Sequence, residues 1–316
     1  MAATSAIESP AVDWLLSSDE PAVQYLTRRD VLGEEIDPDP EEILSGRWVR
    51  ALLSGQQRDG GFGGHPYKKW TGAHWRLVSL VELAAPPGEP RLLAAAERVL
   101  AWLDGPGRRR NLKTIDGLVR RCASQEGNAL AACSRLGMAD DDRVGRLARS
   151  LVDWQWPDGG WNCDQRASGR RSSFHESLAP MWGLHEFAEA TGADWAGDAA
   201  LRTAELFLGH RLFRSLRTGE VIDGAWLAFH YPPYWHYDVL QALLILSRMG
   251  LVGDPRAVEA LELVEQRRLP DGRWAAGSSW WRRPGSRMLI DVVDWGRRGP
   301  NVMITLNALR VLAAAR

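Results

Sequence analysis

The stretch Gln155-Trp156-Pro157-Asp158-Gly159-Gly160-Trp161, followed by Asn162-Cys163-Asp164, decides the fold because related stretches occur twice more in the chain. Asp-Gly and Gly-Gly pairs favour tight turns, since glycine tolerates the positive φ that such turns need. Gln57-Arg58-Asp59-Gly60-Gly61-Phe62 precedes this stretch, and Gln266 with Pro270-Asp271-Gly272-Arg273-Trp274 follows it. Aligning Gln57, Gln155 and Gln266 predicts an internal repeat of roughly 50 residues, with a weaker copy between the strong ones.

Helical patterns of two kinds alternate along the chain. Amphipathic segments are expected at 41–53, 91–103, 143–154, 198–208 and 255–267, and more apolar segments at 74–83, 126–136, 175–190, 236–249 and 301–315. The runs Val239-Leu240 and Leu243-Leu244-Ile245-Leu246 make one helix apolar nearly all round, which is typical of a helix buried on every side. Almost no alternating strand pattern occurs. The sequence therefore predicts an all-α protein, an α/α toroid of about five to six hairpins with inner and outer helices, and an open superhelical solenoid is the alternative.

Composition points to one domain over residues 1–316, with a disordered start at 1–9 and N-terminal helices in 10–44 that pack on the toroid. The net charge of −1 argues against a nucleic-acid partner. Three cysteines, Cys122, Cys133 and Cys163, are too few for a disulfide framework. No basic leader occurs, and no apolar run approaches the ~20 residues that span a bilayer. We expect a cytoplasmic protein without a transmembrane segment, and the sequence indicates no oligomeric state.

The three glycine turns resemble the repeat motifs of the terpenoid cyclase and prenyltransferase superfamily. Squalene–hopene cyclases carry several such turns, and protein prenyltransferase β subunits carry a form similar to Gly60-Gly61-Phe62. The resemblance covers residues 45–316 and implies an α/α toroid with a largely apolar, isoprenoid-type substrate in its central cavity. Class II cyclases use an Asp-X-Asp-Asp acid, but Ala139 stands where the first aspartate would precede Asp140-Asp141-Asp142. That acidic run is interpreted as a helix cap, and the chain would supply one toroid only.

Histidines mark the starts of the apolar helices, which converge on one mouth of a toroid. His74, His175 and His236 occupy three of the five starts. Histidine is the usual acid–base group near neutral pH and the commonest metal ligand. His175 and His236 are therefore predicted catalytic residues, with Asp238 or Glu176 orienting them.

The resemblance also implies a metal alternative, because protein prenyltransferases hold zinc with an Asp-X-Cys and a histidine at inner-helix starts. Phe174-His175-Glu176-Ser177 looks like their histidine segment, and His236-Tyr237-Asp238 lies where their Asp-X-Cys would be. The candidate ligands of zinc or another divalent metal are Cys163, Asp164, His175 and His236. Two other interpretations stay open: acid–base histidines with no cofactor, or histidines that only hydrogen-bond a neighbouring loop.

Aromatic residues near the same helix starts predict a substrate-binding wall. Its candidate residues are His74, Trp75, Trp182, Trp235 and Tyr237, with Arg171 as a contact for a diphosphate or carboxylate. Aromatic faces favour apolar ligands and stabilise carbocations. Trp161 and Trp274, in the turns, are expected to hold the repeats together.

These observations favour an enzyme, a terpenoid cyclase/prenyltransferase-like protein that binds an isoprenoid-type small molecule and lacks the usual aspartate acid. A carbohydrate-active lyase or hydrolase on the same toroid is one alternative, because sugars stack on the same aromatic residues. A non-catalytic binding or scaffold protein is the other. No phosphate-binding GxxxxGK[ST] loop, GxGxxG turn or Gly-X-Ser-X-Gly elbow occurs, so nucleotide hydrolysis, a Rossmann cofactor and serine hydrolysis are unsupported.

Overall fold

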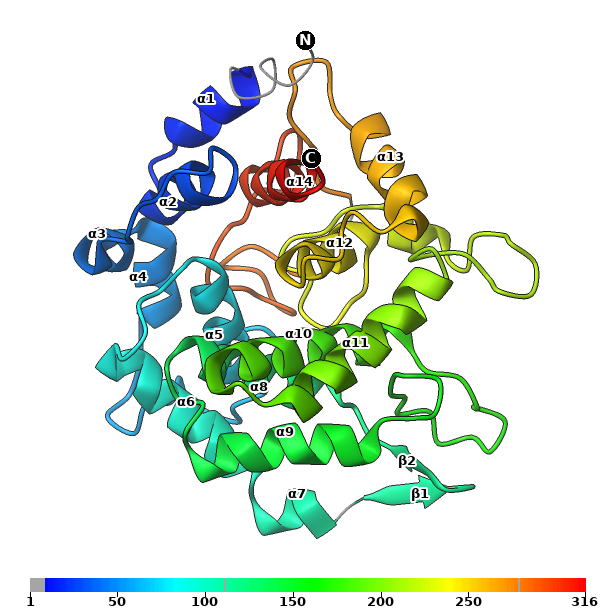
Figure 1. The fold of residues 1–316 in the computed structure, drawn as a ribbon. Coiled ribbons are helices and arrows are strands. Elements are labelled where there is room, and N and C mark those ends of the chain that lie inside the picture. Colours follow the sequence, from blue (N-terminus) through cyan, green and yellow to red (C-terminus); the bar gives the residue numbers. More distant parts are fainter. Residues whose placement is uncertain (1–8, 111, 278) are drawn as a thin grey trace.

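The computed structural model describes residues 9–110, 112–277 and 279–316, and within them the chain is almost entirely helical (Figure 1). Within these described residues, fourteen α-helices and one two-stranded sheet confirm the all-α prediction. The helices are α1 (Pro10–Leu16), α2 (Pro21–Asp30), α3 (Pro40–Ser45), α4 (Arg47–Leu53), α5 (Ala73–Glu82), α6 (Pro90–Leu103), α7 (Pro106–Arg110), α8 (Ser124–Arg135), α9 (Asp142–Trp154), α10 (Phe174–Thr191), α11 (Asp194–Gly209), α12 (Val239–Arg248), α13 (Val258–Gln266) and α14 (Val302–Ala314). The disordered start expected at 1–9 lies outside the described residues except for Ser9, which caps α1.

The apolar helices contact one another in chain order. Helix α5 packs on α8, α8 on α10, α10 on α12, and α12 on α14. Helix α14 in turn packs on α2, and α4 packs on α5. Each of α5, α8, α10 and α12 also packs against the amphipathic helix that follows it, which is α6, α9, α11 or α13. In Figure 1 the apolar helices α8, α10, α12 and α14 lie nearer the middle of the molecule, whereas α6, α9 and α13 lie nearer its edge.

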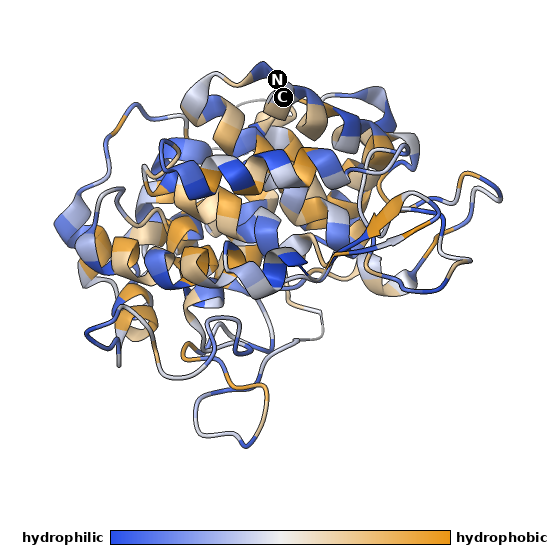
Figure 2. Ribbon diagram, turned by 90° about the horizontal axis from the view of Figure 1, so that it is seen from below, coloured by the Kyte–Doolittle hydropathy of each residue, from blue (hydrophilic) through white to orange (hydrophobic). Residues whose placement is uncertain are grey.

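Side-chain patterns explain this division between the two groups. Helix α9 buries Val144, Leu147, Ala148 and Leu151, which form one stripe at helical spacing, while its other face stays polar. Helix α12 buries every residue from Val239 to Leu246. In Figure 2 hydrophilic and hydrophobic residues alternate along the helices of the near face. None of the helices in the described part of the chain is both long enough and apolar enough to cross a membrane.

The three glycine turns share one hydrogen-bond pattern, and it corrects the sequence alignment. The N–H of Gly159 donates to the Trp156 carbonyl, as that of Gly60 does to Gln57 and that of Gly272 to Leu269. The equivalent of Gln155 is therefore Gln56 rather than Gln57, and in the third turn it is Arg268 rather than Gln266. Side chains agree, because Gln56 Nε2 donates to Gly60 O at 3.1 Å and Gln155 Nε2 to Gly159 O at 3.0 Å.

The glycines let the first two turns approach the next amphipathic helix closely. Gly159 has φ 95°, and a Cβ there would stand 2.4 Å from the Arg202 carbonyl of α11. The same Cβ at Gly60 would stand 2.2 Å from the Ala94 carbonyl of α6. The turns therefore join one repeat to the following one.

The tryptophan that ends the second and the third turn bonds a carbonyl of the amphipathic helix before it. Trp161 Nε1 donates to Leu151 O at 2.9 Å, and Trp274 Nε1 donates to Val264 O at 2.7 Å. Both indoles are fully buried, in agreement with the predicted role of Trp161 and Trp274.

Three local features differ from the expected boundaries. The helix expected over 41–53 is broken at Gly46 into α3 and α4. Helix α12 begins at Val239 rather than 236, because Asp238 is its N-cap and accepts a hydrogen bond from Gln241 N. A hairpin of β1 (Lys113–Ile115) and β2 (Leu118–Arg120) was not expected from the sequence. The acidic run does cap a helix, since Asp141 accepts the N–H of Arg143 at the start of α9.

An ion-pair belt joins the far ends of the apolar helices. Its members are Asp30 of α2, Glu82 of α5, Arg135 of α8, Glu186 of α10, Arg248 of α12 and Arg310 of α14. Glu82 lies 3.1 Å from Arg135 and 2.8 Å from Arg248, and Arg310 lies 2.7 Å from Asp30. Burial opposes ionisation of Glu82, but Arg248 and Arg135 outweigh it and lower its pKa to about 2.

Candidate functional site

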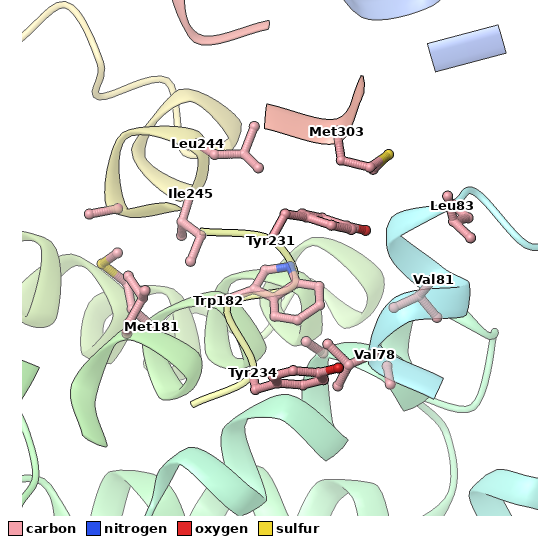
Figure 3. Packing of buried hydrophobic residues seen from close by; sticks show 14 of the residues in the cluster. Val78, Val81, Leu83, Met181, Trp182, Tyr231, Tyr234, Leu244, Ile245 and Met303 are labelled. Carbon is pink, nitrogen blue, oxygen red and sulfur yellow. The ribbon is translucent and has the colours of Figure 1, made fainter. Parts of the chain in front are cut away.

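An aromatic segment, residues 228–238, fills the space between the apolar helices. Figure 3 shows Trp182 of α10 between Tyr231 and Tyr234, with Val78 and Ile245 nearby. Tyr234 stacks on Trp70 at 3.7 Å between ring centroids, and its hydroxyl donates to Asp291. The inner cavity beside these rings measures about 50 Å³ and reaches from His175 to the Glu82–Arg248 ion pair. Space of this size admits a few water-sized groups rather than an isoprenoid chain.

His175 and His236 face one another with opposite hydrogen-bonding roles. The N–H of Tyr237 donates to His175 Nδ1 at 2.8 Å, so the neutral ring carries its proton on Nε2. His236 Nδ1 lies 3.2 Å from the carbonyl of Pro233 and must donate to it, which leaves its Nε2 as an acceptor. The two ring centroids are 6.3 Å apart. The structure thus places a donor and an acceptor side by side.

Burial keeps both rings neutral. It lowers the pKa of His175, against the opposing effect of Asp223, and it lowers the pKa of His236 to about 3. The His236 ring is also stacked between Trp235 at 3.8 Å and Trp280 at 3.9 Å. A base with so low a pKa is inefficient at neutral pH, so His236 serves better as a hydrogen-bond acceptor.

The two carboxylates expected to orient these histidines have other partners. Asp238 accepts the backbone N–H of His230 at 3.0 Å and lies 3.2 Å from its Nδ1. Glu176 accepts the N–H of Ser124 at 3.0 Å, and Ser173, the N-cap of α10, makes no side-chain cap bond. Asp238 contacts His230 because α12 starts three residues later than expected, which turns the Asp238 side chain toward His230.

Several residues of the predicted binding wall belong to the core instead of a cavity. His74 and Trp75 are each 1% exposed, and His74 packs among the rings of Tyr67, Trp75 and Trp102. Burial lowers the pKa of His74 to about 3. Tyr237 is 2% exposed and donates its hydroxyl proton to Leu212 O at 2.5 Å. Trp182 and Trp235, in contrast, do line the inner cavity.

A larger opening, the α10–α11 cleft, lies outside the ring of aromatic residues. It measures about 1150 Å³ and is lined by the loop before α10, one face of α11 and the loop around 215–226. Phe174, Leu206 and Trp226 provide apolar lining, with Phe174 and Trp226 stacked at 4.6 Å. His175 lines both this cleft and the inner cavity.

Four arginines and three acidic residues, Asp158, Glu205 and Glu220, line the cleft. Arg170, Arg171, Arg202 and Arg217 all line it. Arg170 pairs with Asp116, and Arg202 donates to Gln155 Oε1. The guanidiniums of Arg171 and Arg217 have no ion pair among the residues that the structure describes. Arg171, predicted as a substrate contact, is thus free to bind an anion.

The predicted metal ligands separate, and a different set comes together. Asp164 pairs with Arg166 at 2.8 Å, while His175 and His236 face the inner cavity. Cys163 instead lies beside Cys122 and Glu176, and the three ligand atoms are within 4.8 Å of one another. The Cys163 thiol lowers the pKa of Cys122, whereas burial raises the pKa of Glu176. Sequence reasoning missed Cys122 as a candidate ligand. Its position just before the start of an apolar helix was the available signal, as the position of Cys163 just after a glycine turn was.

Comparisons with protein families and curated proteins give no match, so the function is inferred from the residues of the site. No protein-family model matches the chain, and no curated protein matches it significantly.

Proposed function

We propose that the chain is a single α/α toroid of the terpenoid cyclase/prenyltransferase-like group and that it binds an isoprenoid-type small molecule. Two observations support the closed ring. Helix α14 packs on α2, so the last apolar helix contacts the beginning of the chain. The ion pair between Arg310 and Asp30 joins the same two helices. An open solenoid has no such contact between its first and last repeats.

The bulk of the ligand lies in the α10–α11 cleft and one end reaches His175. The observation that carries this proposal is that His175 lines both the cleft and the inner cavity. A cleft of about 1150 Å³ has room for a ligand that the inner cavity of about 50 Å³ cannot hold. Phe174, Leu206 and Trp226 contact the apolar chain, and Arg171 binds an anionic head group.

Each of these groups has a distinct role in the proposed complex. His175 Nε2–H donates a hydrogen bond to a ligand oxygen, because its Nδ1 is occupied by the Tyr237 N–H. The stacked Phe174 and Trp226 rings present aromatic surface to the apolar chain, and such faces also stabilise developing positive charge. A cyclase- or transferase-like reaction without an Asp-X-Asp-Asp acid is the activity proposed.

Calorimetric titration with farnesyl diphosphate, farnesol and inorganic diphosphate tests the proposal. Farnesyl diphosphate should bind more tightly than either fragment, because only it uses both the apolar lining and Arg171. Arg171→Gln should weaken binding about 10-fold to 100-fold, since a hydrogen bond to a charged group is worth about 1.5–3 kcal/mol. Arg58→Gln is the matched control, because Arg58 is an exposed arginine in the first glycine turn, outside the cleft.

His175→Gln tests the polar contact separately. The glutamine oxygen can still accept the Tyr237 N–H, so the helix start is kept while the ring donor is lost. We expect weaker binding of farnesyl diphosphate with unchanged circular dichroism. Equal affinity of all variants, or binding of an acidic oligosaccharide in place of farnesyl diphosphate, would overturn the isoprenoid assignment.

A further inference from the structure

Two cysteines and one glutamate from three separate segments meet at the start of α8. Cys122 lies between β2 and α8, Cys163 follows the central glycine turn, and Glu176 is in the first turn of α10. One sulfur from each cysteine and a carboxylate oxygen lie within 4.8 Å of one another. We call these three residues the thiol–carboxylate cluster.

Backbone hydrogen bonds hold the cluster in place. The N–H of Arg121 donates to Asn162 O at 3.1 Å, which fixes the segment before Cys122 against the segment before Cys163. The N–H of Ser124 donates to Glu176 Oε2 at 3.0 Å and orients the carboxylate. The Cys163 thiol lies 3.5 Å from Glu176 Oε1. The three ligand atoms therefore converge because the backbone around them is fixed.

The charge of Glu176 is not balanced by a cation. Its side chain is buried, and the structure gives it no ion pair within the described residues. The guanidiniums of Arg108 and Arg121 pair with Glu126. A buried carboxylate is costly unless a positive charge or several hydrogen bonds compensate it. Glu176 is hydrogen-bonded by the backbone N–H and the side chain of Ser124 and by the Cys163 thiol, none of which is a cation, so a bound cation would complete its environment.

The two cysteines differ from the third one in accessibility. Cys122 and Cys163 are partly exposed, whereas Cys133 is fully buried within α8. A small buried cysteine acts as a hydrophobic side chain, but an accessible pair beside a carboxylate offers ligands to a metal. Thiolates select soft or borderline ions, and zinc accepts both sulfur and carboxylate oxygen.

We propose that Cys122, Cys163 and Glu176 bind one divalent metal ion, preferentially zinc, and leave a fourth coordination position for water or a substrate group. Tetrahedral zinc with bonds of about 2.0–2.3 Å holds neighbouring ligand atoms about 3.3–3.8 Å apart. Atoms that now lie within 4.8 Å reach this spacing by side-chain adjustments of about 1 Å. Three protein ligands with one open position are the arrangement of catalytic rather than structural zinc sites.

Zinc binding to the thiol–carboxylate cluster must release a defined number of protons. Each cysteine thiol loses its proton as a sulfur–zinc bond forms, so two protons leave the cluster for each ion bound at neutral pH when Glu176 is already ionised. No oxidant or reductant takes part. Titration in buffers of different ionisation enthalpy measures this number directly.

Cobalt(II) provides the most direct test on the full chain, reduced and freed of metal by a chelator. We expect one cobalt per chain, with thiolate-to-cobalt charge-transfer absorption and the visible bands of a tetrahedral site, and displacement by zinc. Cys122→Ser, Cys163→Ser and Glu176→Gln should each weaken zinc binding at least 100-fold. Cys133→Ser is the matched control and should bind as the native chain does.

Several results would overturn the metal site. One is absence of thiolate-to-cobalt absorption while both accessible thiols still react with a thiol reagent. Another is equal zinc affinity in the Cys122→Ser and Cys133→Ser variants with unchanged circular dichroism. A third is a Cys122–Cys163 disulfide that persists under mild reductant and excludes metal. The test is independent of the isoprenoid proposal, because neither cysteine lies among the residues lining the α10–α11 cleft.

Discussion

At the scale of single residues, the glycine turns show how one hydrogen bond is replaced by another. The indole N–H groups of Trp161 and Trp274 each donate to the carbonyl ten residues earlier. Their backbone N–H groups donate to hydroxyls of the following apolar helix, that of Trp161 to Ser177 and that of Trp274 to Thr305. The first turn has Phe62, which has no indole N–H. There Arg76, at the position of Ser177 and Thr305, donates to Leu52 O at 2.7 Å and stacks on Phe62 at 4.0 Å.

Because Arg76 takes the place of an indole N–H beside Phe62, we expect substitutions at Phe62 and Arg76 to have coupled effects on stability. Arg76→Ser should destabilise the protein by about 3 kcal/mol, because the carbonyls of Leu52, Ser54 and Thr71 lose their donor. Adding Phe62→Trp should return about 1 kcal/mol, since the new indole can reach Leu52 O as Trp161 reaches Leu151 O. Phe62→Trp alone should not stabilise the chain. Urea unfolding of the four proteins measures the coupling, and strictly additive changes would contradict the proposed equivalence.

The turns were also where sequence reasoning was most informative, apart from their register. Asp-Gly pairs revealed the turns because glycine is needed where φ is positive. The doublet Gln56-Gln57 offers two matches for Gln155, and the alignment on Gln57 overlooked that only Gln56 has the same spacing to Asp59-Gly60-Gly61. The backbone bond of Gly60 N–H to Gln57 O and the side-chain bonds of Gln56 to Gly60 O and Arg91 O agree on Gln56.

At the scale of helices, the ion-pair belt joins elements that are far apart in the sequence. Glu82 bonds Arg135 and Arg248, so one carboxylate connects α5 with both α8 and α12. Its side chain is only 13% exposed, and it compensates the charge of Arg248 and, together with Glu186, that of Arg135. Breaking a buried pair by removing one partner leaves an uncompensated charge.

Glu82→Gln should therefore lower the free energy of unfolding at pH 7 by about 3–5 kcal/mol. Glu97→Gln is the matched control and should cost at most about 1 kcal/mol, because the Glu97–Arg143 pair is half exposed. Comparable losses in both variants, measured by chemical unfolding, would mean that the belt contributes no more than a surface pair.

Acid should remove the same contribution in the native chain. The folded pKa of Glu82, about 2, lies below the ordinary value of 4.5, so its stabilisation is complete above pH 4.5 and is lost as the pH falls toward 2. The difference in unfolding free energy between the native chain and Glu82→Gln should thus shrink over this range. A difference that stays constant from pH 7 to pH 3 would argue against the depressed pKa.

The candidate site was less predictable than the helices, for a physical reason. Amphipathic periodicity located α9, because a buried stripe requires it, and continuous apolar runs located α12. The long connection between α11 and α12 has no such periodicity, and its Tyr231 and Tyr234 fill the inner cavity region. His175 could be placed at a helix start from sequence, whereas the partners of Asp238 and Glu176 depend on where loops and neighbouring helices end.

At the scale of the whole molecule, the first described helices contact the last one. Helices α1 and α2 both pack on α14, and the Arg310–Asp30 pair fastens the contact. A closed ring needs this contact, because its first and last repeats are neighbours. In an open solenoid each repeat contacts only the next, and the ends lie apart.

Circular permutation distinguishes these architectures. Joining Arg316 to Ser9 through a short flexible linker, and opening the chain between Gly192 and Ala193, should give a folded protein with native-like circular dichroism and cooperative unfolding. Gly192 is exposed and has φ 69° at the end of α10, so new termini there disturb no buried contact. Opening within α12, between Leu243 and Leu244, is the control and should prevent folding, because both residues are buried. A permutant opened at Gly192 that fails to fold, beside a native chain that folds, would show that the ends cannot be joined and would favour the open array.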